Sequence, residues 1–181
     1  MHDRATCGFV AGILGAFVQM IFTYSVYYGT GLLKFRFADY AGIIFWGSRP
    51  EGLLQSVFAE FLVWFYSGVL GAVFALLIKI YSSEHLMMKG FSFGILYWYL
   101  NNGYITAFRV EGLYPIGFPT AAIHVVGGII LGLTTAKAYA YLAKKYRIEE
   151  NAMQQNHTRL NLIAQPAMKP LENNNDENEG R

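Results

Sequence analysis

Charged side chains are scarce in this sequence. Only 14% of the 181 residues are Asp, Glu, Lys or Arg, against about 25% in soluble globular domains. A water-soluble protein could not cover its surface with so few charges. Apolar and aromatic residues make up 54% of the chain, and aromatic rings concentrate where a membrane meets water. The formal net charge of +2 is too small to indicate nucleic-acid binding.

Cysteine and recognisable catalytic motifs are nearly absent as well. Cys7 is the only cysteine, so it cannot form a disulfide within the chain, and no Cys/His spacing indicates zinc. We interpret Cys7 as a small packing residue; a lipid attachment site is the alternative. The sequence has no P-loop, GxSxG, HExxH or dinucleotide-binding pattern. We therefore predict that the protein is not an enzyme and holds no metal and no cofactor.

Long apolar segments, by contrast, are abundant. A helix that spans a bilayer needs about 20 mostly apolar residues, and four segments meet this requirement. They cover about residues 7–28, 54–80, 88–108 and 118–141. Because they are apolar all round rather than along one stripe, they are typical of membrane helices and not of a soluble bundle. We predict an all-α integral membrane protein whose residues 1–147 form a domain of four transmembrane helices.

Two segments outside these spans have a composition of their own. Residues 29–52 contain a short apolar stretch, 41–46, which is flanked by charged residues and is too short to cross a membrane. We predict an interfacial helix there, in the headgroup region, with a re-entrant loop as the alternative. Residues 148–181 contain seven Asn, scattered acids and few large apolar side chains. We predict that this C-terminal tail is disordered.

The basic residues near the span ends indicate the orientation, because Lys and Arg favour the cytoplasmic side. One side would carry Arg4, Lys79, Lys89, Lys137, Lys144, Lys145 and Arg147. The other would carry Lys34, Arg36, Arg49 and Arg109. We therefore predict a multi-pass protein of the cell (inner) membrane with both termini in the cytoplasm. No cleavage site follows the first apolar run, so we interpret this run as an uncleaved anchor.

Small residues recur at helix-packing spacing within the spans. The glycines concerned are Gly8, Gly12, Gly15, Gly68, Gly71, Gly90, Gly94, Gly128 and Gly132. Glycine at this spacing lets two helix backbones approach closely in a membrane. We predict that these glycines pack the helices of one chain together. A face that pairs with another copy or with a partner protein is the alternative.

Each predicted span also carries a polar side chain at a similar depth. Counted from the outer boundary at about 1.5 Å per residue, these side chains lie roughly 9–13 Å into the membrane. They are Gln19, Glu60, Asn101, Asn102 and His124. Because small residues share the faces of Glu60 and His124, we expect this polar layer to point into the bundle rather than toward lipid.

Glu60 is the costliest member of the layer, because a lone carboxylate in hydrocarbon must gain a proton or find a partner. His124 is the best candidate partner at that depth. Our first interpretation is structural: a Glu60–His124 hydrogen bond, together with the Asn and Gln amides, fixes which helix faces which. The alternative is a proton or ion relay, or a small polar ligand site, that Asn102 and Gln19 also line.

The order of these features resembles a known family. A glycine-rich first span leads to a long loop, and the second span ends in FALLIK at residues 74–79. Then follow KGFSFGILYW at residues 89–98, a Pro-containing loop, and a last span with Gly127, Gly128 and Gly132. Over about residues 7–142 this chain resembles the YqhR-like four-helix membrane proteins of Gram-positive spore formers. The resemblance implies four spans and does not by itself imply an activity.

Two functions fit these observations. We predict a non-enzymatic structural or accessory component of a membrane complex, which contacts the lipid bilayer and binds another copy or a partner membrane protein. The alternative is a small transporter, a proton-coupled protein or a channel subunit, in which Glu60 and His124 line a polar path. Under this alternative, replacing either side chain would abolish flux without unfolding the protein.

Overall fold

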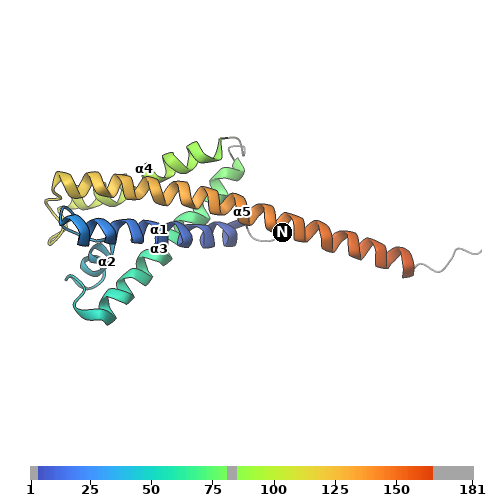
Figure 1. Cartoon of the computed structure of the whole chain (residues 1–181), viewed down its shortest axis with the longest axis horizontal. Coiled ribbons are helices and arrows are strands. Elements are labelled where there is room, and N and C mark those ends of the chain that lie inside the picture. The colour runs from blue at the N-terminus through green and yellow to red at the C-terminus, as the bar shows by residue number, and fades with distance from the viewer. Residues whose placement is uncertain (1–3, 81–84, 165–181) are drawn as a thin grey trace, which may run out of the picture. The chain divides into compact units, whose positions relative to one another are not determined.

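The computed structural model describes residues 4–80 and 85–164 of the chain. All regular structure in these two ranges is α-helical, and no strand occurs in them. The helices are α1 (Arg4–Thr30), α2 (Phe37–Trp46), α3 (Gly52–Ile80), α4 (Leu86–Phe108) and α5 (Phe118–Ala164) (Figure 1). The chain divides into a compact unit of Met1–Lys144 and a second unit of Lys145–Arg181.

Three of the helices are long and apolar enough to cross a membrane. They are Arg4–Thr30, Gly52–Ile78 within α3, and Phe118–Lys145 within α5. This finding confirms an all-α chain with membrane-type helices. α4 is a helix of 23 residues, close to its predicted limits, but it does not reach the same hydropathy, because Lys89, Asn101 and Asn102 interrupt it.

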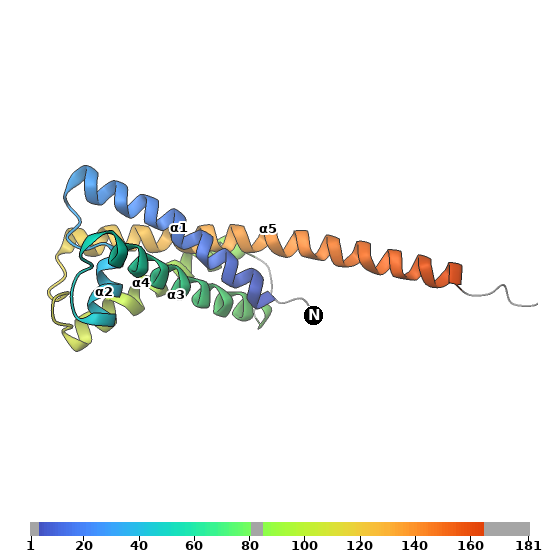
Figure 2. The same cartoon turned by 90° about the horizontal axis from the view of Figure 1, so that it is seen from below.

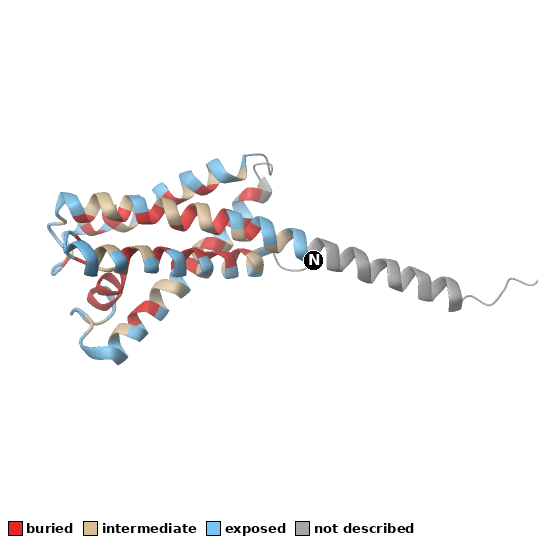
Figure 3. Cartoon of the chain, in the orientation of Figure 1, coloured by how far each residue is buried: buried red, intermediate tan, exposed pale blue. Residues whose placement is uncertain are grey.

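The outer surface of the bundle is apolar as well. Large hydrophobic side chains on it are exposed, among them Phe17, Ile21, Phe61, Phe65 and Leu76. Figure 3 shows exposed positions along the long helices of the first unit. Monomeric soluble proteins rarely expose contiguous apolar patches of this kind. Such an exterior suits a protein that is surrounded by lipid.

α1 and α3 pack together through the small residues noted in the sequence. A Cβ atom placed on Gly8 would lie 2.5 Å from the carbonyl oxygen of Gly71, and one placed on Gly12 would overlap the carbonyl oxygen of Ser67. Gly68 is also packed against α1. The backbones are so close that a larger residue would push the helices apart. Figure 2 shows the two helices converging toward the N-terminal end of α1.

α4 and α5 form a second glycine-mediated pair. A Cβ atom on Gly90 would lie 2.7 Å from the carbonyl oxygen of Gly132 and 2.6 Å from the Cβ of Ala136. A Cβ atom on Gly128 would lie 2.6 Å from the carbonyl oxygen of Gly94. Residue numbers rise along α4 as they fall along α5, so the two helices are antiparallel.

The two helix pairs meet where α1 contacts α5. A Cβ atom on Gly15 would lie 2.8 Å from the carbonyl oxygen of Leu131. The core beside this contact contains Ala11 of α1 and Ala136 of α5, and the half-buried Cys7 packs against it. All nine predicted packing glycines therefore lie at contacts between helices of the same chain.

Most of α2 is buried against the other helices, whereas Ile44 and Phe45 near its end are exposed. Every residue from Phe37 to Ile43 is buried. Ala38 and Ala41 pack against Ala59 of α3, and Figure 1 draws α2 beside the first turns of α3. The sequence predicted this short helix but assigned it to the headgroup region. Its apolar side chains pack on both the α3 and the α4 sides, and its place in the headgroup region stays a prediction.

α5 continues past the end of the predicted transmembrane domain. The tail was predicted to be disordered from residue 148, whereas α5 is helical through Ala164. Residues 148–164 include Glu, Gln, Ala, Met and Leu, which are good helix formers and offset the effect of the asparagines. The most acidic and Asn-rich part of the predicted tail, residues 165–181, lies outside the described residues.

Candidate functional site

The N-terminus of α2 is built around a charged pair. The backbone N–H of Arg36, the residue before the helix, donates to the Asp39 carboxylate over 2.7 Å. The Asp39 N–H in turn donates to the Arg36 carbonyl oxygen over 3.0 Å. An acidic side chain in the first turn of a helix also interacts favourably with the helix dipole. These contacts fix where α2 begins.

The same two residues form a bidentate ion pair. Arg36 Nη2 lies 2.8 Å from Asp39 Oδ1, and Arg36 Nε lies 3.3 Å from Asp39 Oδ2. The Asp39 side chain is only 2% exposed, so the pair is shielded from solvent. Hydrogen bonding to Asp39 raises the pKa of the Arg36 guanidinium, and the Asp39 charge adds to this effect. Arg36 therefore stays charged at any working pH.

Arg36 connects this pair to α1. Its guanidinium carbon lies 5.6 Å from the centre of the Tyr24 ring and 5.3 Å from that of Tyr27, within the range of cation–π attraction. The Tyr24 hydroxyl donates to Glu60 Oε1 of α3 over 2.7 Å. Tyr24, Arg36, Asp39 and Glu60 thus form one continuous polar group, the Glu60 cluster, which joins α1, α2 and α3.

His124 lies in a second group of contacts. Its Nε2 is 3.1 Å from the carbonyl oxygen of Phe35. A carbonyl oxygen can only accept, so Nε2 carries the hydrogen and donates. The other nitrogen, Nδ1, is 3.1 Å from the Tyr40 hydroxyl, which donates to the neutral imidazole. Phe37 stacks on the imidazole with the ring centres 4.5 Å apart. We call these four residues the His124 cluster.

Tyr40 keeps its proton as part of this cluster. Burial raises the pKa of the Tyr40 hydroxyl, and the negative charge of Asp39 raises it further. The hydroxyl therefore remains a hydrogen-bond donor to His124 throughout the neutral range. Asp39, which belongs to the Glu60 cluster, thus also acts on the neighbouring His124 cluster.

One further bond ties the start of this segment to α5. The backbone N–H of Lys34 donates to the Thr120 hydroxyl over 3.0 Å. Residues 34–40 are consequently attached to α1 through Arg36, and to α5 through Lys34, Phe35 and Tyr40. A loop that the sequence placed at the membrane surface is held among the helices.

The predicted Glu60–His124 pair does not form. The Glu60 carboxylate accepts from Tyr24, while both ring nitrogens of His124 are used by Phe35 and Tyr40. Equal depth along two helices does not place two side chains at the same point around the bundle axis, and the prediction used depth alone. Residues 34–40 supply the partners that the prediction assigned to the opposing spans.

The three amide side chains of the predicted layer are separate from Glu60. Gln19 is 1% exposed and lies beside the His124 cluster, because a Cβ atom on Gly127 would be 3.5 Å from Gln19 Nε2 and 3.8 Å from the Phe37 ring. Asn101 Nδ2 and Asn102 Nδ2 donate to carbonyl oxygens one turn back in their own helix, over 2.8 and 3.2 Å. Asn101 also bonds to the Tyr66 side chain of α3, whereas the buried Gln19 Nε2 and Asn102 Oδ1 have no hydrogen-bond partner among the described residues. The predicted single layer is therefore two clusters, a pair of helix-internal bonds and two unpartnered polar atoms.

The residues missed by the sequence reasoning are Tyr24, Arg36, Asp39 and Tyr40. Arg36 and Asp39 had half of a signal, because Asp39 has the spacing of the acid in a capping box, whereas the Arg36 side chain cannot accept the other bond of that motif. The tyrosines had none, since their partners depend on how the helices cross. Among the described residues, no group of three or more His, Cys, Asp or Glu side chains is placed to hold a metal ion.

Comparison of the chain with protein-family models, with curated proteins and with solved structures found no match. The resemblance to the YqhR-like membrane proteins therefore stays a prediction.

Proposed function

We propose that this chain is a structural or accessory component of a membrane complex and that it has no enzymatic activity. In this proposal four transmembrane helices enclose residues 34–40, and both termini lie on the cytoplasmic side of the cell membrane. The observation that carries the proposal is that Glu60 and His124, the two ionisable members of the predicted layer, are both hydrogen-bonded within the chain. Glu60 accepts from Tyr24, and both nitrogens of His124 are bonded within the chain.

The fourth span in this proposal is α4. Its 23 residues extend about 34 Å, which exceeds the roughly 30 Å of a hydrocarbon core. It packs against α5 from Gly90 to Gly94, so it lies at the same depth as a helix that is apolar enough to cross. Its tyrosines and tryptophan lower its hydropathy, but such residues are common near membrane interfaces. An even number of spans puts both termini on the same side of the membrane, as the distribution of basic residues also predicts.

The polar clusters support a structural role because withdrawing residues 34–40 would leave many groups without partners. The bonds from Lys34 to Thr120, from His124 to Phe35 and from Tyr40 to His124 would all be lost. An unpaired polar group costs about 1–3 kcal/mol where water cannot replace the bond. The two clusters thus stabilise the buried position of residues 34–40 within the bundle.

Flux measurements distinguish this proposal from the transporter alternative. Purified protein would be reconstituted into proteoliposomes with a trapped pH dye, as wild type, Glu60→Gln and the exposed-acid control Glu51→Gln. We expect all three to leak protons no faster than empty liposomes under an imposed gradient. A wild-type flux that persists in Glu51→Gln and disappears in a folded Glu60→Gln variant would overturn the structural role and favour a proton pathway.

A further inference from the structure

Residues 34–40 are bonded to α5 through a side chain of the type that gains a proton near neutral pH, His124. Its Nε2 donates to the Phe35 carbonyl oxygen, and its Nδ1 accepts from the Tyr40 hydroxyl, both over 3.1 Å. An imidazole with one donor nitrogen and one acceptor nitrogen is neutral. The segment is therefore held by bonds that only the uncharged side chain can make together.

Protonation of His124 would remove one of these bonds. An imidazolium carries a hydrogen on both nitrogens, so Nδ1 would no longer accept and the Tyr40 hydroxyl would lose its acceptor. His124 is 1% exposed and Tyr40 is 6% exposed, so water has no access to either group while the segment stays in place. A buried charge and a buried hydroxyl without an acceptor are both unfavourable.

The carboxylates nearest to the segment are already bonded to other groups. Asp39 forms its ion pair with Arg36, and Glu60 of α3 accepts from Tyr24 of α1. Neither carboxylate is bonded to His124, whose two nitrogens contact a carbonyl oxygen and a hydroxyl. An imidazolium at this position would have no anionic partner of its own.

The remaining polar groups around the His124 cluster are cationic or uncharged. They are Lys34 and Tyr40 of the segment, Arg49 before α3, Gln19 of α1 and Tyr97 of α4. The Lys34 and Arg49 cations lie 5.2 and 4.4 Å from the centre of the Phe35 ring, and α5 has no charged residue over positions 118–136. A positive charge on His124 would therefore add to the positive charge beside the segment.

Glycines at both ends of the segment allow it to move. Gly31 precedes it and Gly47 follows α2, and both have a positive φ, 66° and 81°. No atom of the described residues lies within 4 Å of a Cβ placed on either glycine, so the backbone is loosely packed at these points. Such positions absorb the changes in φ and ψ that accompany the movement of a segment.

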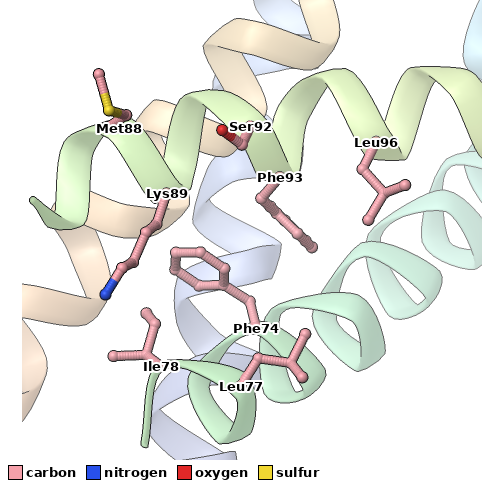
Figure 4. Close-up of a pocket in the computed structure, with 8 residues that line it drawn as sticks. All are labelled: Phe74, Leu77, Ile78, Met88, Lys89, Ser92, Phe93 and Leu96. Carbon is pink, nitrogen blue, oxygen red and sulfur yellow. The ribbon is translucent and has the colours of Figure 1, made fainter. Parts of the chain in front are cut away.

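The opposite end of the bundle is held without His124. Figure 4 shows the Phe74 side chain of α3 beside the Phe93 side chain of α4, and their ring centres are 4.8 Å apart. Ala75 of α3 is 0% exposed and lies against Gly8 of α1. A proton on His124 leaves these apolar contacts intact, so an opening would be confined to the end at which α2 lies.

We propose that protonation of His124 releases residues 34–40 from the bundle, so that the segment is an acid-sensitive switch. The switch rests on the structural role proposed above and adds a regulation to it. In acid, the buried face of α2 becomes available on the side of the membrane opposite the two termini, which is the outside in the proposed topology. Because an exposed imidazole has a pKa of about 6.5, release takes up a proton below that pH, and the released population rises as the pH falls.

The pH dependence of cysteine labelling in lipid nanodiscs tests the switch. In a Cys7→Ser background, Ala38→Cys and Ala75→Cys both occupy positions that are 0% exposed, and Ser48→Cys occupies an exposed one. A charged methanethiosulfonate is the probe, and dividing each rate by that at position 48 cancels the ordinary effect of pH on thiols. We expect the ratio for position 38 to rise about ten-fold from pH 7.5 to pH 5.5, as uptake of one proton near pH 6.5 predicts. The ratio for position 75 should not change.

Two histidine variants identify the group that takes up the proton. His124→Gln keeps one donor and one acceptor but cannot be protonated, so its ratio for position 38 should be low at both pH values. His85→Gln removes an exposed histidine and should keep the ten-fold rise. A rise that persists in His124→Gln, or that occurs equally at position 75, would overturn the switch.

Labelling at pH 7.5 separates the switch from the proposed structural role. Equal rates at positions 38 and 48 would overturn both, whereas a low ratio that is the same at pH 7.5 and pH 5.5 would overturn the switch alone. If His124→Gln is already labelled at pH 7.5, histidine ¹⁵N NMR of the wild type takes the place of this variant. The neutral Nε2–H form of His124 must then become an imidazolium over the same pH range as the labelling, and a change outside that range would refute the proposal.

Discussion

The bond between Tyr24 and Glu60 provides the sharpest test of how the bundle is held together. Tyr24→Phe removes only the hydroxyl and keeps the ring beneath the Arg36 guanidinium. Glu60→Met removes the acceptor and keeps a side chain of similar length. Because the bond is 2.7 Å long and joins Glu60, which is 9% exposed, to the half-buried Tyr24, each single variant leaves a wholly or partly buried polar group without its partner.

The expected size of this effect follows from measurements on other proteins. A hydrogen bond to a charged group contributes about 1.5–3 kcal/mol in water-soluble proteins, whereas polar bonds between transmembrane helices average about 0.6 and reach about 1.7 kcal/mol. For a bond of ordinary length between partly buried groups we expect a coupling free energy of about 1–2 kcal/mol, within these two ranges. In a protein of this length, Tyr24→Phe should then lower the Tm by roughly 3–6 °C.

Thermal unfolding in mild detergent, followed by circular dichroism, gives the four Tm values of the double-mutant cycle. The double variant should be more stable than the sum of the two single losses predicts. Tyr27→Phe is the matched control, because the Tyr27 ring contacts the same guanidinium, and its effect should be smaller. Additive losses for Tyr24 and Glu60, or a larger coupling between Glu60 and His124, would show that our assignment of partners is wrong.

Further predictions concern helix packing and pH. A Cβ atom on Gly94 would lie 2.9 Å from the Ile129 Cα, so Gly94→Val should separate α4 from α5 and lower the free energy of unfolding by about 1–3 kcal/mol. At the control position, Gly103, the nearest atom is 4.0 Å away, and Gly103→Val should lower the Tm less in the same thermal assay. The pKa of Tyr40 is higher in the folded than in the unfolded protein. The contribution of Tyr40 to the free energy of unfolding should therefore be complete below about pH 10 and decrease as the pH rises above it. Tyr40→Phe should make that fall shallower in a pH series of Tm values, and an unchanged slope would refute the assignment. At neutral pH the same variant should cost about 1 kcal/mol, because His124 loses its donor.

The sequence was sufficient to locate the helices of the bundle, although not the end of α5. An uninterrupted apolar run determines that the backbone must bond to itself in lipid, and the predicted limits of 7–28 accordingly lie within three residues of those of α1. Glycine spacing was similarly informative, because close backbone approach excludes larger side chains wherever it occurs. The contact of Gly8 with Gly71 follows that rule.

The arrangement of the polar groups could not be predicted in the same way. Depth in the membrane follows from counting residues, but the direction of a side chain around the bundle depends on how the helices cross. Tyr24 reaches Glu60 because α1 crosses α3, and His124 reaches Phe35 because residues 34–40 turn inward. Neither event leaves a periodic pattern in the sequence.

The central claim is that the two polar clusters hold residues 34–40 inside the bundle, and cysteine accessibility tests it directly. In a Cys7→Ser background, Ala38→Cys would occupy a position that is 0% exposed, and Ser48→Cys an exposed one. In lipid nanodiscs, a charged maleimide should label the cysteine at 48 and not the one at 38, and adding Arg36→Gln should make position 38 reactive. Equal labelling of both positions in the otherwise unaltered protein would contradict the account.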